Sequence, residues 1–373
     1  MHIFDGFLKK NEKRIVGLDI LRAIAILLVV YKHGRFLLPL HFHNDYLRYY
    51  INIDGVSIFF VLSGFLIGEI LLKIINNSNF TIKDLLNFWI RRWFRTIPNY
   101  LIVLFAIILY QIIFFQNLGQ FSFKYLFFLQ NFISPHPGFF KEAWSLCVEE
   151  WFYILFPGIC YLLHLFTKNK QNSILYSVLL FIIIPLLLRI IKYQLGIGIQ
   201  TFDEEFRKIV VLRLDSIMYG VFASYIWINQ KNIWIKYRFI SLSLGIIMIA
   251  LIKANPYNWL YFYKPFFFNI ESITVLFLMP FFSQLKSTKI KFLDSLFIFI
   301  SIISYSMYLL NLTFVQEQLI PITDKLIGMK GLPIEKTFLV NYLLYLFYTI
   351  FCSCLLYYFY ENPMTRLRDK IKV

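Results

Sequence analysis

The stretch GLDILRAIAILLVVYKHGRF, residues 17–36, combines two properties that seldom occur together. Most of it is apolar and long enough for a membrane-crossing helix, which needs about 20 mostly apolar residues. It also carries four ionisable side chains, Asp19, Arg22, Lys32 and His33. A charged side chain at bilayer depth costs from about 2.5 kcal/mol upward and usually faces a cavity or a partner. The stretch therefore predicts a membrane helix with one polar face.

The rest of the chain supports a membrane location, because 59% of its 373 residues are hydrophobic and 20% are aromatic. Its start is polar and does not resemble a cleaved signal peptide. Apolar stretches of spanning length recur near residues 15–37, 51–73, 97–116, 145–166, 173–193, 208–228, 238–253, 268–285, 293–320 and 338–360. We expect an all-α, polytopic bundle of about ten transmembrane helices, which forms a single domain over 1–373 with no appended soluble domain.

The charge distribution predicts the orientation of these helices. Lys and Arg residues are concentrated in the N-terminal segment 1–14, in the tail 361–373 and in the connections that follow even-numbered spans. By the positive-inside rule these parts are cytoplasmic, so both termini are expected there. The net charge of +16 could suggest nucleic-acid binding, but it lies in short loops between membrane spans. We therefore expect the lipid bilayer, and no nucleic acid, as a partner.

The polar face of the first helix is defined by Arg22 and His33, which are eleven residues apart. At about 100° per residue they lie on one face, separated along the axis by about 16 Å. Asp19 lies three residues before Arg22, within reach of an ion pair. The alternative is that Arg22 extends to the cytoplasmic interface and His33 reaches the outer one.

Small residues mark the second apolar stretch, GVSIFFVLSGFLIGEIL (55–71), at Ser63, Gly64 and Gly68. Such residues let membrane helices approach closely, so this pattern predicts helix packing. The four cysteines, at 147, 160, 352 and 354, lie in or beside apolar spans. They lack partner ligands at metal spacing, so we expect buried thiols and no metal site.

An arginine cluster occurs in FWIRRWFRTIPNY (88–100), on the expected cytoplasmic side. Arg92 and Arg95 are three residues apart and would face one way on a helix, and Arg91 adds a third charge. Pro98 is expected to begin the third span. The cluster is either a positive-inside anchor or a binding site for phosphate oxygens, which guanidinium groups bind in bidentate fashion.

Two adjacent acids, Glu149 and Glu150, occur near the start of the predicted helix AWSLCVEEWFYILFP (143–157). Adjacent residues on a helix point about 100° apart. One acid could therefore cap the helix while the other faces the bundle. Ser145 does not complete a strict capping box with either of them.

These passages, in this order, resemble the acyltransferase 3 family of membrane acyltransferases. The matching passages are LDILRAIAILLVVYKH (18–33), FFVLSGFLI (59–67), RRWFRTIP (91–98), WSLCVEEWFYILFP (144–157), RLDSIMYGVFAS (213–224), ISYSMYLLN (303–311) and YENPMTR (360–366). The family often has His where this chain has Asn311, so we assign no acid–base role to that position. Cys147 stands where Ser is common.

The resemblance implies a multi-pass protein of the plasma (inner) membrane that moves an acyl group, acetyl as the first expectation, from cytoplasmic acyl-CoA to a hydroxyl of a surface or lipid-linked glycan. It implies Arg22, His33 and Glu149 as catalytic residues, and Arg92 and Arg95 match the cytoplasmic Arg-x-x-Arg of the family. We expect Arg92 and Arg95, together with the adjacent Arg91, to form the binding site for CoA. Residues expected to support the substrate or the structure are Asp19, Glu150, Ser145, Arg213 and Asp215. The partners implied are acyl-CoA and a carbohydrate or glycolipid acceptor, and the oligomeric state is left open.

The chemistry of these residue types fits this function. Histidine can take a proton from an acceptor hydroxyl at neutral pH. Arg22 could stabilise the thioester oxyanion or orient the CoA, and Glu149 could orient His33 or position the sugar. Direct transfer and an acyl-enzyme intermediate both remain open. Two other functions are an exporter of glycans or lipid-linked sugars, which would use the same polar pathway, and a catalytically inactive interaction subunit. Internal symmetry between the two halves would favour transport, and we see none.

Overall fold

The computed structural model describes residues 14–38, 54–76, 80–198, 200–254, 264–327 and 333–370. Most of the predicted N-terminal segment 1–14 and the last three residues of the tail 361–373 lie outside these ranges. Within them the chain is helical, with no β-strand. The long helices are α2 (Val16–Gly34), α4 (Gly55–Asn76), α5 (Ile82–Phe115), α6 (Ala143–Thr167), α7 (Lys170–Gln194), α8 (Leu214–Asn229), α10 (Arg238–Ala254), α12 (Phe267–Phe282), α13 (Lys291–Leu310) and α15 (Ile334–Leu356).

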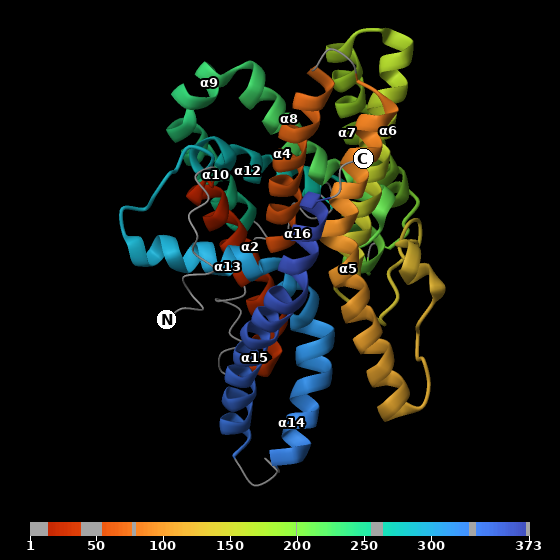
Figure 1. Cartoon of the computed structure of the whole chain (residues 1–373), viewed down its shortest axis with the longest axis vertical. Helices are drawn as coiled ribbons and strands as arrows, with labels where there is room; N and C mark the ends of the chain where they lie inside the picture. Colours follow the sequence, from red (N-terminus) through yellow and green to blue (C-terminus); the bar gives the residue numbers. More distant parts are fainter. Residues whose placement is uncertain are drawn as a thin grey trace.

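Shorter segments connect the long helices. The 3₁₀ turns are η1 (Arg35–Leu37), η3 (Phe123–Phe127), η5 (Val210–Leu212) and η6 (Lys264–Phe266). Three segments are π-helices, η4 (Asp203–Arg207), η7 (Asn311–Leu319) and η9 (Tyr357–Glu361). The remaining helices are α9 (Lys231–Lys236), α14 (Ile320–Ile327) and α16 (Asn362–Lys370). Along the long axis of the molecule, α9 lies at one end and α14 at the other (Figure 1).

The polytopic helix bundle predicted from the sequence is confirmed. Seven helical segments in the described ranges are long and apolar enough to cross a membrane. The predicted spans that this set lacks correspond to α2, which carries the ionisable residues, to α8 and to the shorter apolar helix α10. The total of ten transmembrane helices and the cytoplasmic location of both termini stay predictions.

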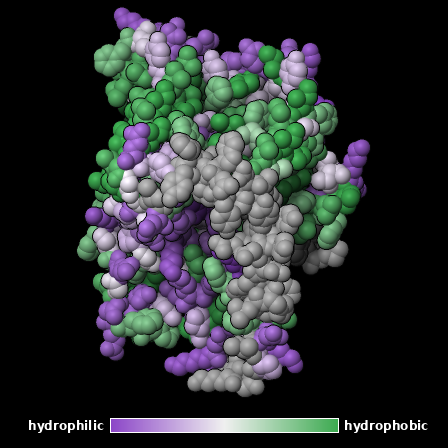
Figure 2. All heavy atoms as spheres, turned by 180° about the vertical axis from the view of Figure 1, so that it is seen from behind, coloured by the Kyte–Doolittle hydropathy of each residue, from purple (hydrophilic) through white to green (hydrophobic). Residues whose placement is uncertain are grey.

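Part of the outer surface of the bundle is apolar, as in proteins that contact lipid. On α5, the side chains of Phe105, Leu109 and Ile113 are all more than half exposed. On the face shown in Figure 2, apolar side chains form a broad band in the upper half, with hydrophilic side chains above and below it. Polar side chains are instead buried between the helices, and they build the site described below.

The packing of α4 against α8 depends on glycine, as the small residues of α4 predicted. A Cβ atom on Gly64 would lie 1.9 Å from the backbone oxygen of Ile217. On α8, a Cβ atom on Gly220 would lie 2.0 Å from the backbone oxygen of Val61. The two backbones therefore approach too closely for any side chain, and this contact fixes α4 in the centre of the bundle.

The third predicted span begins earlier than expected. Pro98 lies inside α5, which already starts at Ile82. The start is defined by a capping box, in which the Thr81 N–H donates to the Asp84 carboxylate over 2.9 Å. Arg91, Arg92 and Arg95 therefore belong to the same helix as the membrane span and not to a loop before it.

Candidate active site

A cavity of ≈ 130 Å³ lies between α2, α4, α5, α6, α13 and η9. Its charged lining residues are Arg22, Arg92, Arg95, Glu149 and Glu361. Ser145 and Tyr308 also line it. The structure thus brings together three of the arginines and one of the acids that the sequence singled out. Arg91 is not among the lining residues.

On α2, the predicted Asp19–Arg22 pair is confirmed, with Nη1 of Arg22 3.6 Å from Oδ1 of Asp19. Ser301 of α13 connects the two, because its hydroxyl donates to Asp19 over 2.6 Å and accepts from Arg22 over 3.2 Å. Arg14 lies closer to Asp19 than Arg22 does, at 2.6 Å. With Asp19 already neutralised by Arg14, the guanidinium of Arg22 remains available to the cavity.

The two adjacent acids of α6 face different helices. Glu149 accepts a hydrogen bond from Tyr153 over 3.0 Å and lines the cavity. Glu150 is buried and accepts from Thr96 of α5 over 2.6 Å. The expectation that one of them caps the helix is wrong, because α6 begins at Ala143 and its first turn contains no acid.

Glu361 is a cavity residue to which the sequence analysis gave no role. It ends the π-helix η9 and accepts a hydrogen bond from Ser306 of α13 over 2.5 Å. The signal was present, since the acid lies in the quoted passage YENPMTR at the end of an apolar span. An acid beside apolar spans is a candidate functional residue for physical reasons alone.

His33 lies at the end of α2, and its side chain forms a hydrogen bond with Asn311 rather than with Glu149. Nδ1 of His33 is 2.5 Å from Oδ1 of Asn311, the first residue of η7. Asn311 in turn donates to the backbone oxygen of Tyr308 over 2.8 Å. Tyr308 lines the cavity, and its hydroxyl lies 2.5 Å from the hydroxyl of Ser145, where either group can be the hydrogen-bond donor. Tyr308 therefore connects the cavity to the surroundings of His33.

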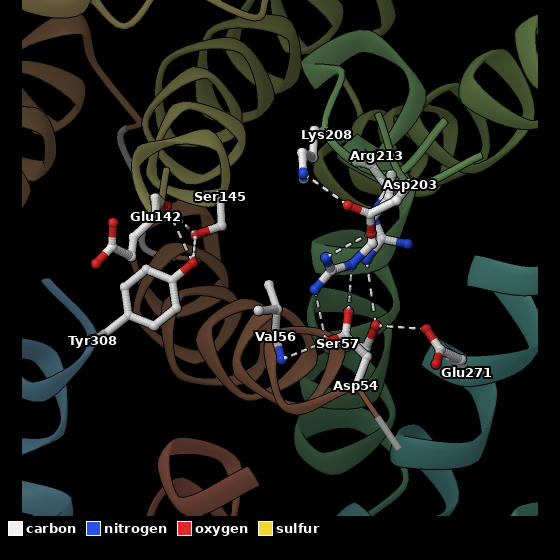
Figure 3. A network of polar contacts seen from close by, with 11 residues as sticks. Asp54, Val56, Ser57, Glu142, Ser145, Asp203, Lys208, Arg213, Glu271 and Tyr308 are labelled. Atoms are coloured by element: carbon white, nitrogen blue, oxygen red, sulfur yellow. Dashed lines mark hydrogen bonds and ion pairs between the residues drawn. The ribbon is translucent and has the colours of Figure 1, made fainter. Parts of the chain in front are cut away.

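A second polar network lies near the start of α4 (Figure 3). Arg207 binds the Asp54 carboxylate in bidentate fashion, at 3.0 and 2.9 Å, and lies over the Trp144 ring. Burial alone would raise the pKa of Asp54, but the adjacent Arg207 guanidinium outweighs it and holds that pKa well below its usual range. Asp203 pairs with both Arg207 and Lys208. This network ties the start of α4 to η4.

Arg213 and Asp215, the two charges of the passage 213–224, are fully buried in separate contacts. Arg213 donates to Ser57 over 3.3 Å and lies 3.8 Å from the centre of the Phe268 ring. Ser57 donates to Glu271 of α12, as Figure 3 shows. Asp215 pairs with Arg189 of α7. Neither Arg213 nor Asp215 lines the cavity, so both connect helices rather than contact it.

Residues 15–358 match a family model described as an acyltransferase domain. The chain belongs to the acyltransferase 3 family. No solved structure shows a significant match.

Several curated proteins are similar to this acyltransferase-family chain. The O-acetyltransferase OatA of Staphylococcus aureus (strain NCTC 8325 / PS 47) is 27% identical over 326 residues, which are 80% of this chain and 50% of that protein. A protein of Staphylococcus aureus (strain COL) named "Putative O-acetyltransferase" is 29% identical over 82% of this chain and 51% of its own length. Bacillus subtilis (strain 168) has YrhL, named "Putative peptidoglycan O-acetyltransferase", 34% identical over 40% of this chain and 24% of that protein. The chain thus spans about half the length of the curated relatives it matches most fully.

Proposed function

We propose that this chain is a membrane O-acetyltransferase that moves an acetyl group from cytoplasmic acyl-CoA to a hydroxyl of a cell-surface or lipid-linked glycan. The observation that carries the proposal is the cavity itself, which is lined by Arg22, Arg92 and Arg95 and by Tyr308. The backbone oxygen of Tyr308 accepts a hydrogen bond from Asn311, which in turn contacts His33. The family membership and the names of the relatives support acetyl transfer.

At the donor end, Arg92 and Arg95 bind the phosphates of CoA. Guanidinium groups suit phosphate because two parallel N–H groups match two oxygens. Arg22 lines the same cavity from α2, where its charge stabilises the oxyanion that develops on the thioester carbonyl during transfer. Glu149 and Glu361 balance the positive charge of the cavity while no donor is bound. The pantetheine arm places the thioester inside the bundle.

At the acceptor end, His33 takes the proton of the attacking hydroxyl. The acceptor oxygen forms a bond to the thioester carbonyl carbon, and the carbon–sulfur bond then breaks. The CoA thiolate leaves toward the arginines and takes up the proton that His33 removed from the acceptor, which returns the imidazole to its neutral form. The products are an O-acetyl ester on the glycan and free CoA, each on the side from which its precursor came.

The test is transfer by the purified protein in proteoliposomes. Labelled acetyl-CoA is supplied on one side, and oligosaccharides, including peptidoglycan fragments, are supplied on the other. We expect label in an ester of the oligosaccharide, and its loss in His33→Ala and Arg22→Ala proteins that still insert and fold. A wild-type protein that moves the glycan across the bilayer without acetylating it would instead support the exporter.

A further inference from the structure

The side-chain amide of Asn311 has only one orientation that satisfies its surroundings. Its nitrogen lies 2.9 Å from the backbone oxygen of Met307 and 2.8 Å from that of Tyr308. Carbonyl oxygens only accept hydrogen bonds, so the NH₂ group must face them. The amide oxygen of Asn311 must therefore be the atom that faces His33, which it does at 2.5 Å. Asn311 is fully buried, so no water competes for this position.

This orientation dictates where the imidazole of His33 carries its hydrogen. The amide oxygen cannot donate, so Nδ1 of His33 must be the donor in the contact. A neutral imidazole has one N–H, which leaves the lone pair on Nε2. The nearby Tyr345 hydroxyl does not change this, because it donates to the backbone oxygen of Val30 over 3.0 Å and lies 3.5 Å from the amide oxygen of Asn311.

We propose that Asn311 is a positioning residue that fixes His33 in the Nδ1–H tautomer, so that Nε2 is the atom that takes the acceptor's proton. The inference rests on the proposed function for the role of His33, and it adds the atom that reacts and the residue that selects it. Because a side-chain amide does not titrate near neutral pH, Asn311 orients the imidazole ring without taking a proton itself.

Asn311 is held in place by the helix break at which it occurs. It begins the π-helix η7, and π-helical turns are frequent at functional sites. The backbone N–H groups of Leu312 and Thr313 donate to Glu142, the residue before α6, over 2.9 and 2.8 Å. The Thr313 hydroxyl donates to the same carboxyl group over 2.5 Å. Glu142 thus fixes the turn that presents Asn311.

The tautomer can be measured without an activity assay. In ¹⁵N-histidine-labelled protein, the nitrogen shifts distinguish protonated from unprotonated ring nitrogens, and the difference from His33→Ala identifies His33 among the six histidines. We expect Nδ1 protonated and Nε2 unprotonated in the wild type, and a mixture of both tautomers in Asn311→Leu. Protonation on Nε2 in the wild type, or an unchanged single tautomer in Asn311→Leu, would overturn the inference.

Steady-state kinetics provide a second test. General-base catalysis contributes typically 10²–10⁴-fold, so losing the correct tautomer in part should lower kcat by roughly 10- to 100-fold in Asn311→Leu, with the KM for acyl-CoA unchanged. Asn311→His should recover most of kcat, because one imidazole can accept from His33 and donate to a backbone oxygen. If His33→Ala is inactive while Asn311→Leu keeps full activity, only this inference fails. If His33→Ala stays active, the proposed role of His33 as the general base fails, and this inference fails with it.

Discussion

Nη2 of Arg189 lies 2.6 Å from Oδ2 of Asp215, and neither side chain is exposed. Asn269 of α12 closes the network, because its amide oxygen accepts from Arg189 over 2.5 Å and its nitrogen donates to Asp215 over 3.0 Å. Arg189 also donates to the backbone oxygen of Pro265 over 2.8 Å. One ion pair therefore joins α7, α8 and the start of α12, in a region where an unpaired charge would be strongly unfavourable.

Removal of one partner should destabilise the fold. Asp215→Ala leaves a buried guanidinium without its counter-charge, which typically costs about 3–5 kcal/mol. We expect a large loss of folded protein, measured by detergent-solubilised yield and thermal melting. Glu69→Ala is the control, because its pair with Lys73 is an exposed i,i+4 pair and should contribute below about 0.5 kcal/mol. Equal melting temperatures for the two variants would contradict a structural role for the buried pair.

Glycine-to-alanine substitutions should destabilise the fold at the α4–α8 contact but not on an open helix surface. Gly64→Ala and Gly220→Ala each place a Cβ within 2.0 Å of a backbone oxygen, so the helices must move apart. We expect loss of folded protein in both. Gly158→Ala on α6 meets nothing within 4 Å, and should be neutral or stabilise by about 0.5–1 kcal/mol through helix propensity. A well-folded Gly64→Ala protein would show that the close approach is not required.

Glu142 should make stability depend on pH. Burial raises the pKa of Glu142 from 4.5 to about 7, against the hydrogen bonds from Thr313 that lower it. Between these values the folded state holds a proton that the unfolded state lacks, so stability falls as pH rises through this window and levels off above it. The total is on the order of 3 kcal/mol. Glu142→Gln lacks this titration. The melting temperature of the wild type should therefore decline from pH 5 to 8, and that of the variant should not share this decline. The same pH dependence in both proteins would refute the prediction.

Relationships within one helix could be predicted from the sequence, because they depend on spacing alone. The Asp19–Arg22 pair, the shared position of Arg92 and Arg95 on the cavity and the divergence of Glu149 from Glu150 all follow from 100° per residue. The helix bundle follows from the length of the apolar runs.

Relationships between helices could not be predicted in this way. Ser301 is 279 residues from Arg22, and Asn311 is 278 residues from His33. Which helix faces which depends on packing, and no local pattern encodes it. The same holds for the partner of Asp215, although Arg189 was visible as a charge within an apolar span.

The arginines of α5 provide a test of donor binding with a matched control. Arg92 lines the cavity, whereas the neighbouring Arg91 does not. Hydrogen bonds to charged groups contribute roughly 1.5–3 kcal/mol, so Arg92→Ala should raise the KM for acyl-CoA by roughly 10- to 100-fold. Arg92→Lys should recover only part of this, since the bidentate geometry is lost. Arg91→Ala should change the KM little. A similar effect of both alanine variants would mean that the cluster acts through its total charge near the membrane.

The separation of donor and acceptor onto opposite faces can be tested by cysteine labelling. The connection between α5 and α6 is expected on the outer side, and the connection between α12 and α13 on the cytoplasmic side, by the positive-inside rule. In the first, Ser134 is exposed whereas Phe139 and Phe140 are buried, so Ser134 is the suitable position for a probe. In the second, Lys286 is exposed.

In a background with the four native cysteines replaced by alanine, a membrane-impermeant maleimide added to intact cells should label Ser134→Cys but not Lys286→Cys. Permeabilised cells should label both, which shows that each thiol is reactive. Labelling of Lys286→Cys alone in intact cells would place the arginine end of the cavity outside. Because acyl-CoA is cytoplasmic, that result would remove the donor from the arginines and with it the proposed direction of transfer.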